Sequence, residues 1–113
     1  MAPRDKTSSS TLFGRRLREV RLRIPCTQEK LGIMIGLDEG TARSRISRYE
    51  TGNIKSPRSA AKQVSDALQI PLAYFYCDDD LLARMVIAYW SLDEAKRAEV
   101  LVLVERMAAA QPE

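Results

Sequence analysis

The sequence predicts an all-helical fold, and three observations support this prediction. Apolar residues recur three and four positions apart along most of the chain, which places them on one face of a helix. Proline, glycine and N-capping residues stand where this spacing breaks. No segment shows the alternation of a strand more strongly than it shows the helical spacing.

The first helix is predicted between Leu12 and Ile24. Its apolar residues keep helical spacing, and arginines occupy much of the remaining face. Pro25 ends it, because proline disfavours the helical conformation in the residue before it. Residues 1–10 contain no apolar stretch, so we expect a disordered lead and not a secretory signal.

The second helix is predicted at about residues 28–36. Thr27 is a favourable N-cap, and Gly36 can take the left-handed conformation that often ends a helix. The residues expected to point inward are Leu31, Met34 and Ile35.

The third helix contains the most informative stretch of the chain, I-S-R-Y-E-T-G at 46–52. In sequence order there stand a basic helix, T-Q-E at 27–29, this stretch, S-P-R at 56–58 and A-L-Q-I-P at 67–71. The ordered set resembles the helix-turn-helix of the Xre, or phage Cro-repressor, family of DNA-binding regulators, from about Phe13 to Phe75. The resemblance implies a five-helix repressor-like domain whose third helix enters DNA.

The start of the third helix departs from the family's pattern. Between Gly36 and the isoleucine of I-S-R the pattern has five residues, whereas this chain has nine, Leu37 to Arg45. We expect the four extra residues, about one turn, to extend the helix at its N-terminus with Asp38 as the cap. A longer irregular turn is the alternative, which Gly40 favours.

Two more helices complete a domain of residues 11–77. After a loop at Asn53–Lys55, Ser56-Pro57 starts the fourth helix with proline at its first position. A short fifth helix, Leu72 to Tyr76, follows Pro71. The inner stripe of the fourth helix comprises Ala60, Ala61, Val64, Ala67 and Leu68.

Residues 78–110 are predicted to form a C-terminal helical hairpin. Its first helix, Leu81 to Tyr89, follows three aspartates, which favour a helix N-terminus. Its second helix, about residues 92–109, follows a capping box made by Ser91 and Glu94.

The last helix is also predicted to hold a homodimer. Its run from Val100 to Val104 is apolar on all sides and therefore needs cover on two. One side can pack on helix 81–89, and the other on the domain body or on a second chain. We expect a second chain, because a two-fold protein on a two-fold operator doubles the contacts. The stripe assigned to this interface is Val100, Leu103, Val104 and Met107.

The net charge of +3 is unevenly distributed. Residues 1–58 carry 13 Lys and Arg against 6 Asp and Glu, a net of +7, and residues 59–113 carry 5 against 9, a net of −4. A basic front half indicates a polyanionic partner that meets one end of the molecule. A solvated charged surface without a partner is the alternative.

The third helix carries the donors that a DNA-binding helix needs. Ile46 and Tyr49 should point inward, which leaves the polar residues of the helix on the opposite side. We assign base contacts to Arg43, Ser44 and Arg48, because the guanidinium fork of arginine matches guanine O6 and N7. Backbone contacts are assigned to Gln28, Arg45, Ser47, Lys55 and Arg58. The alternative is that these arginines are solvated charge or contact phosphates only.

The resemblance implies three of these roles. It gives the glutamine at the place of Gln28 a phosphate contact, and it puts Lys55 and Arg58 beside the DNA backbone or the minor-groove edge. It also implies a structural pair between Arg21 and Glu50, since a carboxylate on the DNA face would repel phosphate.

Several other classes of protein lack support. The chain has no histidine, no nucleophile with a base in sequence context, no G-x-G-x-x-G and no P-loop, so we expect no enzyme and no cofactor. Cys26 and Cys77 alone cannot complete a zinc shell, and consecutive aspartates at 78–80 point in different directions, so we expect no metal. No apolar run is long enough to span a membrane, and two free thiols fit a cytoplasmic protein.

These observations lead to one expected function and two alternatives. We expect a transcriptional repressor that binds double-stranded DNA as a homodimer through its third helix. An antitoxin that neutralises a toxin partner and autoregulates its operon is the rival, which the C-terminal hairpin would serve. A coactivator bridge with little DNA affinity would not need so many arginines in the third helix.

Overall fold

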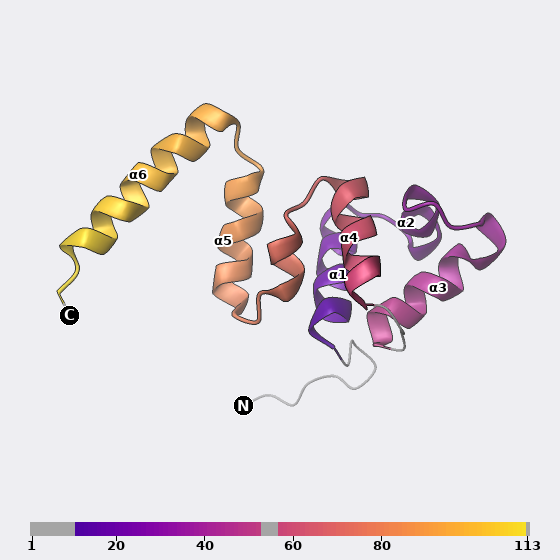
Figure 1. Ribbon diagram of the computed structural model, residues 1–113. Coiled ribbons are helices and arrows are strands. Elements are labelled where there is room, and N and C mark those ends of the chain that lie inside the picture. Colours follow the sequence, from indigo (N-terminus) through magenta and orange to yellow (C-terminus); the bar gives the residue numbers. More distant parts are fainter. Residues whose placement is uncertain (1–10, 53–56, 113) are drawn as a thin grey trace.

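The computed structural model describes residues 11–52 and 57–112, and within them every element is helical, as the sequence predicts. In chain order the elements are α1 (Leu12–Arg23), α2 (Gln28–Met34), α3 (Glu39–Thr51), α4 (Pro57–Leu68), the 3-10 helix η1 (Leu72–Tyr76), α5 (Asp80–Trp90) and α6 (Glu94–Ala110) (Figure 1). The lead predicted at 1–10, the loop at Asn53–Lys55 and Ser56 lie outside the described residues.

One core joins the first five elements. Each of them contributes a fully buried apolar side chain; these residues are Leu17, Leu31, Ile46, Val64 and Phe75. The stripe predicted for α4 faces this core, with Ala60, Ala61 and Val64 buried and Leu68 packed at its edge. The core therefore holds α3 firmly while its other side stays free.

Two helix ends follow the local chemistry of the sequence. The Thr27 hydroxyl accepts from the Lys30 backbone N–H at 3.0 Å and caps α2. Gly36 after α2 and Gly52 after α3 have φ of +94° and +88°, the left-handed conformation that glycine adopts without strain.

The prediction for Met34 is wrong, because its side chain is 45% exposed. The buried side of α2 comprises Leu31 and Gly32, and Met34, the last residue of a helix that ends about two residues earlier than predicted, lies off that side. The chain turns there, so Leu31 and Ile35 pack on the core while Met34 faces outward.

The four extra residues before I-S-R lengthen α3. The helix begins at Glu39, with Asp38 at the N-cap position but without a side-chain cap hydrogen bond. Ala42 is fully buried against Gly32 of α2, so close that a Cβ on Gly32 would lie 2.5 Å from the Ala42 Cβ. This packing holds the added first turn in a helical conformation. The expected extension of the helix is therefore confirmed, and the irregular turn does not form.

The capping box predicted at Ser91 and Glu94 is absent. Helix α5 runs to Trp90, so Ser91 is taken up as its C-cap and its hydroxyl donates to the Ala88 carbonyl at 2.6 Å. Asp93 caps α6 instead, accepting from the Lys96 N–H at 2.8 Å.

The two C-terminal helices differ in how they relate to the core. Helix α5 packs on it through Ala83, Val86 and Ile87, and the Trp90 indole donates to the Gln69 carbonyl at 2.9 Å. Helix α6 instead diverges from α5 and extends away from the body (Figure 1), and none of its residues is buried. The expectation that one side of α6 packs on α5, and the alternative that α6 closes the core, are both wrong for the single chain.

Candidate nucleic-acid interface

Helix α3 has one buried side and one exposed side. The buried side comprises Ala42, Ile46, Tyr49 and Glu50. Arg43, Ser44, Arg45 and Arg48 are exposed and Ser47 is half-buried. The inward prediction for Ile46 and Tyr49 is confirmed, and the three residues assigned to bases all lie on the solvent side of one helix.

The exposed residues of α3 do not all point the same way. Consecutive residues of a helix are about 100° apart. Ser44 and Arg48 therefore point directly away from the buried side, whereas Arg43 and Arg45 lie on opposite flanks. The Ser44 hydroxyl donates to the Thr41 carbonyl at 3.2 Å, which leaves its oxygen free to accept a hydrogen bond.

Arg21 and Glu50 form the expected pair between α1 and α3. The Arg21 Nε donates to Glu50 Oε2 at 2.6 Å and its Nη2 to Oε1 at 3.3 Å. The two side chains are only 13% and 3% exposed. Because the carboxylate is turned inward and neutralised, Glu50 does not oppose a phosphate at the surface.

Gln28 contributes to the same arrangement from α2. Its Nε2 donates to Glu50 Oε1 at 3.2 Å. Glu50 thus receives hydrogen bonds from both neighbouring helices, and the three helices of the motif are held together by one carboxylate. Gln28 was assigned to the DNA backbone, yet its amide points to Glu50 and has one N–H left for another acceptor.

A shallow depression opens beside this pair. Its volume is about 550 Å³, and it is lined by Arg18, Arg21, Thr27, Gln28, Glu29 and Arg43. Arg18 was not predicted as a site residue. The sequence did contain an indication of it, since Arg18 precedes Arg21 by three residues and shares its side of α1.

The other two residues assigned to the DNA backbone, Lys55 and Arg58, follow α3 in the sequence. Arg58, in the first turn of α4, is exposed. Lys55 lies outside the described residues, so the structure gives no position for it.

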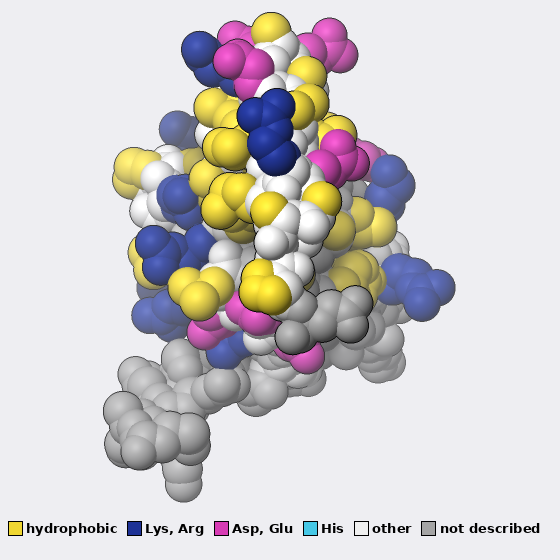
Figure 2. All heavy atoms as spheres, turned by 90° about the vertical axis from the view of Figure 1, so that its left-hand side faces the viewer, with side chains coloured by type: hydrophobic (Ala, Val, Ile, Leu, Met, Phe, Trp, Pro, Cys, Tyr) yellow, Lys and Arg dark blue, Asp and Glu magenta, His cyan; other side chains and the backbone are white. Residues whose placement is uncertain are grey.

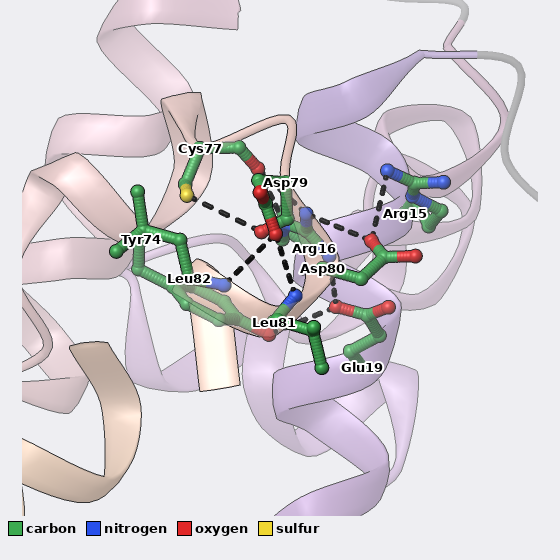
Figure 3. Close-up of polar contacts among 9 residues, drawn as sticks. All are labelled: Arg15, Arg16, Glu19, Tyr74, Cys77, Asp79, Asp80, Leu81 and Leu82. Carbon is green, nitrogen blue, oxygen red and sulfur yellow. Dashed lines mark hydrogen bonds and ion pairs between the residues drawn. The ribbon is translucent and has the colours of Figure 1, made fainter. Parts of the chain in front are cut away.

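A second polar cluster, at the junction of α1 and α5, was not predicted (Figure 3). Arg16 is 1% exposed and donates to the Cys77 carbonyl at 2.9 and 2.6 Å, to Glu19 at 2.8 Å and to Asp80 at 3.0 Å. Asp79 caps α5 through the N–H groups of Leu81 and Leu82. Asp80 anchors α5 to Arg16 and also pairs with Arg15 at 3.3 Å, a contact between helices that the sequence did not indicate.

Burial and neighbouring charges determine the protonation states of Arg16 and Tyr74 in this cluster. Burial disfavours the charged form of Arg16, but its hydrogen bonds and charge interactions with Glu19 and Asp80 outweigh this, so its pKa is raised. Burial, together with the Glu19 carboxylate, also raises the pKa of Tyr74. The Tyr74 hydroxyl therefore stays protonated and donates to Glu19 at 3.0 Å.

Among residues 11–52 and 57–112, no helix is long and apolar enough to cross a membrane. In the same ranges, no group of three or more His, Cys, Asp or Glu side chains is arranged to hold a metal ion.

Comparison with known proteins gives a structural relative. No protein-family model matches the sequence, and no curated protein matches it. The chain is similar to the crystal structure of the transcriptional regulator BswR, with 33% sequence identity and a TM-score of 0.78. The alignment covers 88% of this chain and 98% of that one.

Proposed function

Because this chain belongs to the same family as the transcriptional regulator BswR, we propose that it is a sequence-specific DNA-binding repressor of the Xre type. The observation that carries the proposal is the exposed side of α3, where Arg43, Ser44 and Arg48 stand on a helix fixed to the core by Ile46 and Tyr49. A rigid helix with free guanidinium groups meets the main requirement for major-groove recognition.

In the proposed complex α3 enters the major groove. Arg43 and Arg48 donate to guanine O6 and N7, and Ser44 contacts a neighbouring base edge. Gln28, Arg45, Ser47, Lys55 and Arg58 contact the backbone and fix the register of the helix. The exposed position of Arg58 in the first turn of α4 supports a phosphate role for this residue.

We further propose that two chains associate through α6. Its stripe is bare in the single chain: Leu103, Val104 and Met107 are exposed, Met107 by 64%, and Val100 is half-buried. Hydrophobic side chains gather along the face of the molecule on which α6 projects (Figure 2). Repression requires only that such a dimer occupy its operator.

An antitoxin role remains the second candidate, favoured by the same observation. An apolar helix that extends from the body also fits the groove of a different protein. The two candidates differ in what the isolated chain does. A repressor dimer is stable alone, whereas an antitoxin needs its toxin to cover α6.

The DNA-binding proposal is tested by selecting bound duplexes from a random pool with the full chain. We expect one preferred sequence. Arg43→Ala or Arg48→Ala should each cost about 1–3 kcal/mol at one base position and relax the preference there. Arg58→Ala is the control, because loss of a phosphate contact weakens binding to all sequences alike. Unchanged preference in both α3 variants would contradict base recognition by this helix.

A further inference from the structure

We propose that Arg18 of α1 is an additional DNA-binding residue, which holds a backbone phosphate beside the base that Arg43 contacts. This inference rests on the proposed function and deepens it. Arg18 of α1 and Arg43 of α3 line the same depression beside the Arg21–Glu50 pair. Both arginines are exposed.

The charges in this depression are not equally available. Arg21 is occupied, since it donates to Glu50 and also to the Cys26 carbonyl at 3.1 Å. Within residues 11–52 and 57–112, Arg18 and Arg43 form no ion pair and no side-chain hydrogen bond. Glu29 is the single free carboxylate among the lining residues, so two unpaired guanidinium groups face it and the depression attracts anions.

A neutral donor adds to this charge. The Thr27 hydroxyl uses its oxygen to accept from the Lys30 N–H, so its proton remains free to donate. Arg18 and Thr27 thus offer a charged and a neutral donor at one depression. Phosphate oxygens accept hydrogen bonds from both types of group.

The position of Arg43 indicates that the anion bound in the depression is a phosphate of the DNA backbone. Arg43 lies on the flank of α3 that borders the depression, whereas Arg45 lies on the opposite flank. When α3 lies in the major groove, a backbone runs along each flank of the helix. The backbone on the Arg43 side then passes over the depression, where Arg18 holds it and Arg43 reaches past it to a base edge. Arg18 thereby sets the position from which Arg43 acts.

The chain offers a matched control for Arg18. Arg23 is another exposed arginine of α1, but it lies beside Tyr74, Asp80 and Arg84 in a different depression. Arg18→Ala and Arg23→Ala remove the same charge from the same helix. Neither side chain is buried, so both variants should melt at the temperature of the wild-type chain.

The first experiment measures affinity of the full chain for the selected duplex and for a non-specific duplex over a range of salt concentrations. Arg18→Ala should weaken binding to both duplexes about tenfold. It should also reduce the slope of log K against log salt by about 0.9, the value for one phosphate contact. Arg18→Lys should keep that slope, and Arg23→Ala should change affinity less than about twofold. Equal losses in Arg18→Ala and Arg23→Ala would overturn the proposal.

The second experiment locates the contact. Single phosphates of the selected duplex are replaced by neutral methylphosphonates. The wild-type chain should bind more weakly when the replaced phosphate is the one next to the base position at which Arg43→Ala relaxes the preference. The affinity of the Arg18→Ala variant should not change on that replacement. If Arg18→Ala remains as sensitive as the wild type at every phosphate, Arg18 does not bind one. Failure of the proposed function is separate, because the wild-type chain would then show no preferred sequence at all.

Discussion

Glu50 is an acidic residue among residues that we propose to bind DNA. Its position between Arg48 and Lys55 in the sequence would place a negative charge near phosphates. The helical register removes this conflict, because Glu50 lies on the same side of α3 as Ile46 and Tyr49. There it binds Arg21 and Gln28, so its charge serves the packing of three helices.

Removal of one partner of this pair should destabilise the fold. Glu50→Ala leaves Arg21, whose side chain is only 13% exposed, without its counter-charge, and this loss costs about 3–5 kcal/mol for a well-buried pair. Arg21→Ala should cost a similar amount, and the double variant should cost little more than either. Urea unfolding of the three variants measures this coupling.

An exposed ion pair serves as the control. The Lys62 Nζ lies 2.9 Å from Asp66 Oδ1, and both side chains are 63% exposed. Asp66→Ala should therefore cost less than about 1 kcal/mol. Additive losses for Arg21→Ala and Glu50→Ala would show that the two side chains are not coupled.

The residues that were predicted and those that were missed differ in how local their partners are. Ile46, Tyr49 and the exposed arginines of α3 follow from helical spacing within one element. Arg16 does not, because its main acceptor is the Cys77 carbonyl, 61 residues away in the sequence. In the sequence Arg15, Arg16 and Arg18 are equivalent members of a basic helix, and only the folded chain separates a buried anchor from a free donor.

At the level of elements, the contact between α2 and α3 decides the conformation of the insertion. Periodicity favoured a helix for the extra residues between Leu37 and Arg45, but Gly40 left an irregular turn as the alternative. The missing information was tertiary: Ala42 in the added turn fills the space over Gly32. Helix α2 carries a glycine there because the two backbones approach too closely for a side chain.

Two glycine substitutions should therefore act in opposite directions. Gly32→Ala should destabilise the fold by about 1–3 kcal/mol, since its Cβ would lie 2.5 Å from the Ala42 Cβ and the helices must move apart. Gly40→Ala should stabilise it by up to about 1 kcal/mol, because a Cβ there meets open space and alanine favours the helix. Thermal unfolding of both variants gives the two signs. Destabilisation by Gly40→Ala would mean that the added turn is not helical in solution.

At the scale of the whole molecule, the surfaces proposed for DNA binding and for association lie at opposite ends. The molecule is elongated, 53 Å in its longest extent, with α3 at one end and α6 projecting from the other (Figure 1). Within the predicted hairpin of 78–110, α5 is anchored to α1 through Asp80 and packs on the core, whereas no residue of α6 is buried. Capping and periodicity predict both helices, but they do not tell which of them joins the core.

Deletion of α6 should therefore separate association from folding. A chain that ends at Ser91 keeps Ala83, Val86 and Ile87 on the core and the contact of Asp80 with Arg16, so it should fold as a monomer. It should bind an operator half-site weakly, because the linkage to a second half-site is lost. Sedimentation velocity and half-site titration measure the two effects.

A point variant tests the same surface in the intact chain. Leu103→Asp puts a charge in the α6 stripe, where burial of each large apolar side chain contributes about 1.5–3 kcal/mol. We expect it to convert a dimer at about 50 µM into a monomer, which would bind operator DNA without the advantage of paired half-sites. Leu22→Asp is the control: Leu22 is an exposed leucine of α1, away from α6, so this variant should remain dimeric. A wild-type chain that sediments as a monomer at this concentration, with and without DNA, would remove the homodimer and leave α6 to a different protein partner.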